Sequence, residues 1–137
     1  MRILGFTRKD WMNYLTDQPK LEEEEFTTFR FRRRDRDWEV AEVAQVVYKP
    51  RRKGGGEYMG IAQIVRKDTR WVLANTDDEV KHYAGYFAYK VVTEAEAQMD
   101  GFESRIEMIG WVGGTHHLRN LLEPMNKLTL RWVKEER

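Results

Sequence analysis

The stretch from Phe26 to Lys53, with the sequence FTTFRFRRRDRDWEVAEVAQVVYKPRRK, decides the fold of this chain. Its first seven residues alternate in the way of a β-strand whose two faces differ. One face holds Thr27, Phe29 and Phe31 and is expected to face the core. The other face holds Thr28, Arg30 and Arg32. The segment from Trp38 to Tyr48 is apolar on nearly both faces, so a second, buried strand is expected there.

Strand composition recurs along the rest of the chain. Further strands are expected at Arg2 to Thr7, Tyr58 to Val65, Thr69 to Ala74, Tyr86 to Val92 and Leu128 to Val133. The strand from Tyr58 should pair with the strand before it as a hairpin with a long tip. Many short strands in one domain must protect their edges, which favours closure of the sheet. The sequence therefore predicts one domain over residues 1–137, of the α+β, mostly β class: a small antiparallel pseudo-barrel with short inserted helices.

Short helices are expected between these strands. Thr7 is placed to cap a helix from Arg8 to Thr16. Three segments have the capping-box spacing, in which Ser or Thr stands three residues before Glu: Thr76–Glu79, Thr93–Glu96 and Ser104–Glu107. A further helix is expected from Thr115 to Glu123. The residues from Asp17 to Glu25, which end in four consecutive glutamates, are expected to form an exposed loop.

Composition excludes several classes of protein. No apolar run approaches the roughly 18 residues that a membrane-spanning helix needs, and the N-terminus has no signal-peptide pattern, so a cytoplasmic protein without a membrane partner is expected. The absence of cysteine excludes disulfides, thiolate catalysis and cysteine zinc sites. The histidines, His82, His116 and His117, lack metal-ligand spacing. Neither a metal nor a cofactor is therefore expected.

Positive charge is concentrated in one part of the chain. Residues 26–53 contain nine Lys and Arg against four Asp and Glu, a net charge of +5, whereas the whole chain has a net charge of only +1. Such asymmetry indicates an anionic partner, and arginine forks match phosphate geometry. The expected nucleic-acid-binding residues are Thr28, Arg30, Arg32, Arg33, Arg34, Lys49, Arg51, Arg52 and Lys53. The alternative for the strand is a solvated face whose arginines pair with the acidic run that ends at Glu25. The alternative for residues 49–56 is a flexible hairpin tip that binds no ligand.

The order of short motifs resembles that of a known family. Thr28-Phe29-Arg30 is followed by Trp38-Glu39-Val40, by the strand Gly60-Ile61-Ala62-Gln63-Ile64-Val65, and by the segment that ends in Gly101-Phe102-Glu103-Ser104. This order is similar to that of the ASCH domain family, in the PUA-like superfamily, over nearly the whole chain from Phe26 onward. The resemblance implies a PUA-like pseudo-barrel with a cleft beside the Thr-x-Arg strand, and RNA or nucleoside-like ligands.

Some ASCH proteins are similar to small amidohydrolases that remove the acetyl group from acetylcytidine. These enzymes carry a Lys-x-x-Thr-x-Arg pattern, in which Thr28 and Arg30 match but Glu25 stands at the lysine position. A carboxylate cannot replace an amine, so the resemblance favours an RNA- or nucleotide-binding module with Thr28 and Arg30 on the cleft floor. The alternative is an amidohydrolase in which Glu25 is the base and Thr28 positions the ligand or attacks it. A third possibility is a module that binds an acidic protein; the oligomeric state stays open.

Overall fold

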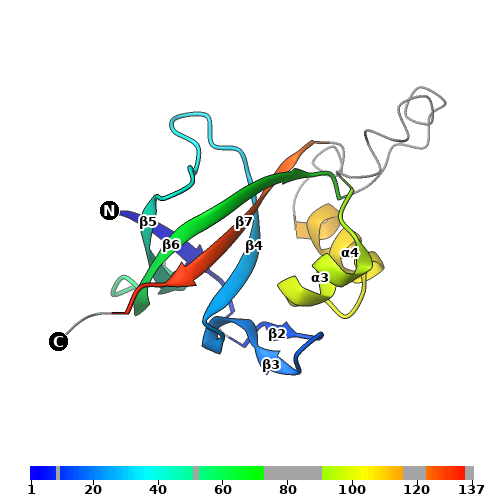
Figure 1. Cartoon of the computed structure of the whole chain (residues 1–137), viewed down its shortest axis with the longest axis horizontal. Helices are drawn as coiled ribbons and strands as arrows, with labels where there is room; N and C mark the ends of the chain where they lie inside the picture. The colour runs from blue at the N-terminus through cyan, green and yellow to red at the C-terminus, as the bar shows by residue number, and fades with distance from the viewer. Residues whose placement is uncertain (9, 51–52, 73–90, 116–122, 135–137) are drawn as a thin grey trace.

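A curled five-stranded sheet forms the body of the molecule, and two helices pack at one end of it (Figure 1). The structure is a computed structural model that describes residues 1–8, 10–50, 53–72, 91–115 and 123–134. The sheet has the order β1 (Arg2–Phe6), β5 (Val43–Tyr48), β6 (Glu57–Arg70), β7 (Met125–Trp132) and β4 (Glu25–Phe31). β1 pairs with β5 in parallel and all the other neighbours are antiparallel. The sheet curls into a half-barrel, which confirms the mostly β, α+β class.

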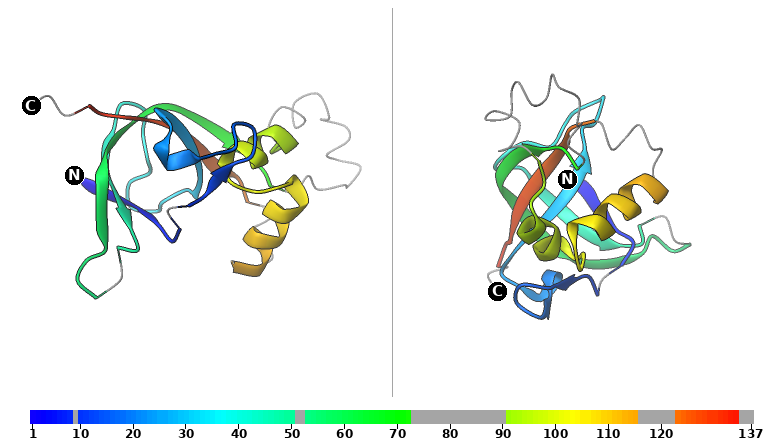
Figure 2. Two further views of the ribbon diagram at one scale, coloured as in Figure 1. Left: turned by 90° about the horizontal axis from the view of Figure 1, so that it is seen from below. Right: turned by 90° about the vertical axis from the view of Figure 1, so that its right-hand side faces the viewer.

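The remaining elements gather at the β4 edge of the sheet (Figure 2). They are the two-stranded ribbon β2 (Met12–Asn13) and β3 (Gln18–Pro19), the 3₁₀ helix η1 (Lys20–Glu22), and the helices α3 (Glu94–Asp100) and α4 (Arg105–Thr115). α3 packs on β4 and on β2. The chain therefore brings its N-terminal ribbon, the arginine-bearing strand and both helices to one place.

The predicted strands with clear alternation are confirmed. β1, β4 and β7 lie where the sequence indicates them, and β5 and β6 form the expected hairpin. The side chains buried between these strands are mostly branched aliphatic residues: Leu4, Val46, Ala62, Ile64, Leu128 and Leu130. Their burial on the concave side provides the apolar area that holds the sheet together.

The predicted helix from Arg8 to Thr16 is wrong. Met12 and Asn13 pair with residues 18 and 19 as a narrow ribbon. Asn13 closes the turn, because its side-chain oxygen accepts a hydrogen bond from the Leu15 amide at 2.9 Å. Asp17 completes the turn with a φ of 57°. The four-residue spacing of the apolar residues in this segment is therefore not a helical stripe, because a local side-chain hydrogen bond competes with the helix.

Three other boundaries differ from the prediction. The second strand begins at Val43 rather than Trp38, because the chain first makes a turn in which Ala41 has a φ of 74°. The two strands expected over residues 58–74 are one strand, β6, with an irregular register between Ile64 and Arg66. The segment expected to be an exposed loop contains β3 and η1, and it buries Lys20.

The capping box at Thr93 is confirmed. The Thr93 hydroxyl accepts a hydrogen bond from the Glu96 amide at 3.1 Å, and the Glu96 carboxylate accepts one from the Thr93 amide at 3.1 Å. Ser104 caps α4 with its hydroxyl, which accepts a hydrogen bond from the Glu107 amide at 3.1 Å, while the Glu107 carboxylate accepts one from the Glu103 amide at 3.1 Å. Gly101 ends α3 with a φ of 122°, as the sequence indicates. These local signals fix where α3 and α4 begin.

Gly101→Ala is expected to destabilise the fold by about 2 kcal/mol, because the residue needs a positive φ that alanine disfavours. A β-carbon there would also lie 2.8 Å from Cε3 of Trp11, a core side chain. Gly110→Ala is the matched control, because Gly110 lies in α4 with no atom within 4 Å of an added β-carbon. We expect the control to stabilise the protein by about 0.5–1 kcal/mol in urea unfolding. Equal effects of the two substitutions would contradict this description of the α3 terminus.

Several predicted elements fall outside the described residues. They are the helix at Thr76, most of the strand from Tyr86 to Val92 and most of the helix from Thr115 to Glu123. Within the part of the chain that the structure describes, no helix is long and apolar enough to cross a membrane.

Candidate functional site

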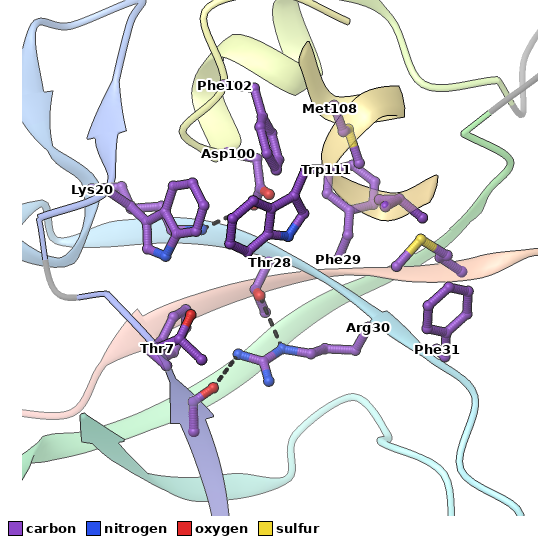
Figure 3. A pocket seen from close by; sticks show the side chains of 15 residues that line it. Thr7, Lys20, Thr28, Phe29, Arg30, Phe31, Asp100, Phe102, Met108 and Trp111 are labelled. Carbon is purple, nitrogen blue, oxygen red and sulfur yellow. Dashed lines mark hydrogen bonds and ion pairs between the residues drawn. The ribbon is translucent and has the colours of Figure 1, made fainter. Parts of the chain in front are cut away.

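A cavity of about 450 Å³ lies between β1, β4, η1 and the two helices (Figure 3). Its polar lining residues are Thr7 after β1, Thr28 and Arg30 from β4, Lys20 from η1, and Asp100 at the end of α3. Six aromatic residues also line it: Phe6, Trp11, Phe29, Phe31, Phe102 and Trp111. Thr28 and Arg30 therefore both line a cavity, at the place where the resemblance to ASCH domains implies a cleft.

Arg30 spans the floor of this cavity from β4 to β1 (Figure 3). Its Nε donates to the Thr28 hydroxyl at 3.1 Å, and its Nη2 donates to the carbonyl oxygen of Gly5 at 2.7 Å. The guanidinium lies 4.8 Å from the ring centre of Phe6. No carboxylate among the described residues forms an ion pair with Arg30. Burial lowers the pKa of Arg30 to about 10, so its charge is retained at neutral pH without a direct counter-ion.

Lys20 is buried at the back of the cavity. Its ammonium donates to the carbonyl oxygen of Thr27 at 2.8 Å and to the Asp100 carboxylate at 3.0 Å. Burial lowers the pKa of Lys20, and the nearby charge of Arg30 lowers it further, while the attraction of Asp100 opposes the shift. Desolvation is the largest of these effects. The cavity therefore contains an amine that loses its proton more readily than an exposed lysine does.

Sequence reasoning did not find Lys20 or Asp100 as site residues. Asp100 carries a weak signal, because a carboxylate at the C-terminal end of a helix is unfavourable for the helix dipole unless a cation lies nearby. Lys20 carries a still weaker one, since it stands between a proline and the apolar Leu21 in an otherwise polar segment. The two residues are 80 positions apart, and no periodic pattern connects them.

Three of the aromatic side chains that line the cavity, Trp11, Phe102 and Trp111, pack against one another. Trp11 packs against Phe102 and against Trp111, each with ring centres 5.4 Å apart, and the two tryptophan rings are nearly perpendicular at 88°. Trp111 keeps 39% of its surface exposed and therefore forms the rim of the cavity. Aromatic faces beside polar donors suit a flat, polar ring better than a flexible aliphatic ligand.

The structure does not bring the other predicted binding residues together in one patch. Arg32, Arg33 and Arg34 follow β4 and are exposed; Arg33 forms an ion pair with Asp35 at 3.2 Å. The end of β4 and the β5–β6 tip lie at opposite ends of β6, so the structure does not bring these arginines together with Lys53. Lys49 instead lines a second cavity with Arg30. The remaining two predicted residues, Arg51 and Arg52, lie outside the described residues.

Glu25 and its acidic neighbours lie away from the cavity. Glu25 is exposed and forms an ion pair with Arg131 at 2.9 Å, and it does not line the cavity. Glu22, Glu23 and Glu24 line a separate shallow groove. In the described ranges, no ion pair joins this acidic run to Arg30 or to residues 32–34. The solvated face predicted as the alternative therefore does not describe Arg30.

Among the described residues, no group of three His, Asp or Glu side chains is placed to hold a metal ion. The three histidines of the chain lie outside those residues. No protein-family model, curated protein or solved structure matches this chain.

Proposed function

We propose that this protein binds a nucleotide, or a nucleotide unit of RNA, in the cavity lined by Thr28 and Arg30. The observation that carries the proposal is the charge of Arg30, which lies on the cavity floor without a carboxylate partner among the described residues. A cation held in this way, beside aromatic side chains, can donate hydrogen bonds to the anionic or carbonyl oxygens of a ligand. The volume of about 450 Å³ falls within the range of small-molecule sites.

The walls suggest how such a ligand would be held. A nucleobase has two flat faces and a polar edge, and the aromatic side chains offer stacking surfaces. The Thr28 hydroxyl accepts a hydrogen bond from Arg30 and can still donate to a base carbonyl. The unused N–H groups of Arg30 can donate to another ligand oxygen. The resemblance to ASCH domains supports the same class of ligand.

Tryptophan fluorescence tests the proposal, because Trp11 and Trp111 both line the cavity. Titration with nucleosides, nucleoside monophosphates and short single-stranded RNAs is expected to quench the emission and to saturate. Arg66→Gln is the control for charge, because Arg66 is an exposed cation of β6 outside the cavity, and it should leave the curves unchanged. A flat response to every ligand would remove the proposal.

Salt dependence distinguishes RNA from a single nucleotide. If the exposed arginines after β4 hold an RNA backbone, the double variant Arg32→Gln, Arg34→Gln should reduce the slope of log affinity against log salt by about 1.4, or about 0.7 for each lost phosphate contact. The affinity for a mononucleotide should not change, because neither residue lines the cavity. If the slope for RNA is the same in the double variant and the wild type, the exposed arginines do not contact the RNA backbone, and the ligand is bound within the cavity alone.

Lys20 favours a second candidate function, hydrolysis of an acylated nucleoside such as acetylcytidine. Glu25 stands at the lysine position in the sequence pattern, but Lys20 places an amine in the same cavity as Thr28. Its lowered pKa favours loss of the ammonium proton, and the neutral amine could then accept a proton from water as the acetyl carbon is attacked. Release of cytidine from acetylcytidine by the wild-type protein, and its loss in Lys20→Arg, would support this function. No release at high protein concentration would reject it.

A further inference from the structure

We propose that the phosphate of the ligand binds in the second cavity, between Arg30 and Lys49, while the base occupies the first. This inference rests on the proposed function and specifies the ligand as a phosphorylated nucleoside rather than a free one. The second cavity has a volume of about 680 Å³. Four residues line both cavities: Gly5, Phe6, Thr7 and Arg30. The two cavities therefore adjoin at Arg30, so one ligand that contacts this side chain could place its base in the first and its phosphate in the second.

The start of the hairpin tip is fixed against β1, so Lys49 has a defined place. The Lys49 amide donates to the carbonyl oxygen of Phe6 at 2.7 Å. Pro50 packs against Gly5 so closely that a β-carbon on Gly5 would lie 2.6 Å from Cγ of Pro50. Gly5 also accepts the hydrogen bond from Arg30. One short segment of β1 thus holds Arg30 on one side and the base of the tip on the other.

The charges around the second cavity have one sign. Its lining residues include two cations, Arg30 and Lys49, and no carboxylate. Lys49 is exposed, lies 5.2 Å from the ring centre of Tyr48, and forms no ion pair within the described ranges. The Thr7 side chain lines the same cavity and supplies a hydroxyl. The residues that line this cavity thus include a guanidinium, an ammonium and a hydroxyl, a set of donors suited to a phosphate.

The same residues do not suit a neutral extension of the ligand. A sugar or a peptide placed there would leave two cations without a partner, whereas a phosphate dianion satisfies both. The cavity is open to solvent at Lys49, so a chain of nucleotides could also leave through it. The donor set therefore favours a phosphorylated ligand. It is compatible with a mononucleotide and with a longer chain of nucleotides.

Paired titrations with nucleosides and their 5′- and 3′-monophosphates test this inference. For the wild type we expect at least one monophosphate to bind about tenfold more tightly than its nucleoside, as one added charge-assisted contact would give. Lys49→Gln keeps the aliphatic stem and the backbone of the site but removes the charge. It should reduce this ratio to about threefold or less while leaving nucleoside affinity unchanged. Lys134→Gln, an exposed lysine outside both cavities, is the matched control.

These titrations distinguish failure of the phosphate site from failure of nucleotide binding as a whole. Equal affinity for nucleosides and monophosphates, or a ratio that Lys49→Gln does not alter, would overturn the phosphate site and leave the base site standing. No binding of any nucleoside, monophosphate or short RNA would overturn the proposed function and this inference together. Competition by inorganic phosphate with a monophosphate, but not with its nucleoside, would give independent support.

Discussion

Replacing Lys20 by methionine is expected to lower the free energy of unfolding by about 3–5 kcal/mol. The substitution keeps the apolar length of the side chain but leaves the Asp100 carboxylate and the Thr27 carbonyl without their buried donor. The ion pair is largely removed from solvent, with side-chain exposures of 4% and 10%, so water cannot replace the lost partner. Removal of one member of such a pair costs much more than the pair itself contributes. Urea unfolding followed by far-ultraviolet circular dichroism measures the change.

The double variant Lys20→Met, Asp100→Asn is the control. It removes the isolated carboxylate as well, and it should recover a substantial part of the lost stability. A cost below about 1 kcal/mol for Lys20→Met alone would contradict the buried ion pair.

The pH dependence of stability gives a second readout of Lys20. Its folded-state pKa is lowered from the ordinary value of 10.5, so between these two values the unfolded chain binds more protons at this residue than the folded one. The wild type should therefore gain stability relative to Lys20→Met as pH rises through that interval. Below the lowered pKa the cost of burying the charged amine is present in full. If the stability of the wild type relative to Lys20→Met fell as pH rises, the pKa of Lys20 would not be lowered in the folded protein.

Replacing Arg30 by glutamine is expected to weaken nucleotide binding by about 100-fold. The guanidinium lines both cavities and would contact the ligand in each, and two lost charge-assisted hydrogen bonds cost about 3 kcal/mol together. Glutamine retains a side-chain amide that can replace the bond to Thr28 or to Gly5, so the fold should survive. Tryptophan fluorescence titrations measure the affinity, and thermal unfolding checks the fold.

Arg30→Lys separates charge from geometry. Lysine keeps the positive charge but has no planar fork, so it cannot bond β1 and bind the ligand in the same arrangement. We expect an affinity between those of the wild type and Arg30→Gln. Wild-type affinity in a folded Arg30→Gln protein would show that the ligand does not use the Arg30 floor.

Local patterns in the sequence predict much of the sheet. The patterns that predict strands β4 and β7 and the capping box of α3 depend on residues a few positions apart, and the structure confirms both strands and the capped helix. Burial does not alternate along β4 as predicted, because Thr27 and Thr28, on opposite faces, are both buried. The failed helix at residues 8–16 shows the limit of this approach, because Trp11 is buried by the distant Phe102 rather than by its own neighbours. β6 likewise continues through three charged residues that suggest a break. Antiparallel pairing with β7 from Ala62 to Arg70 keeps β6 continuous across these residues.

The site was predictable only in part. Thr28 and Arg30 follow from the strand pattern and from the resemblance to ASCH domains, and both line the cavity. Lys20 and Asp100 could not be paired from sequence, because their contact depends on how α3 packs on β4. Lys49 was expected to bind an anion. Its closeness to Arg30, however, depends on the packing of the tip against β1, which no local pattern encodes.

Chemical-shift mapping can show which residues a bound nucleotide contacts. ¹H–¹⁵N spectra that include the arginine Nε–H groups would be recorded while a nucleoside monophosphate is added. We expect saturable shifts at the Arg30 Nε–H and at the amides of Thr28, Gly5 and Lys49, with Arg66 unaffected. Shifts confined to residues 32–34, or no saturable shift at Arg30, would contradict a ligand site on the Thr28–Arg30 floor.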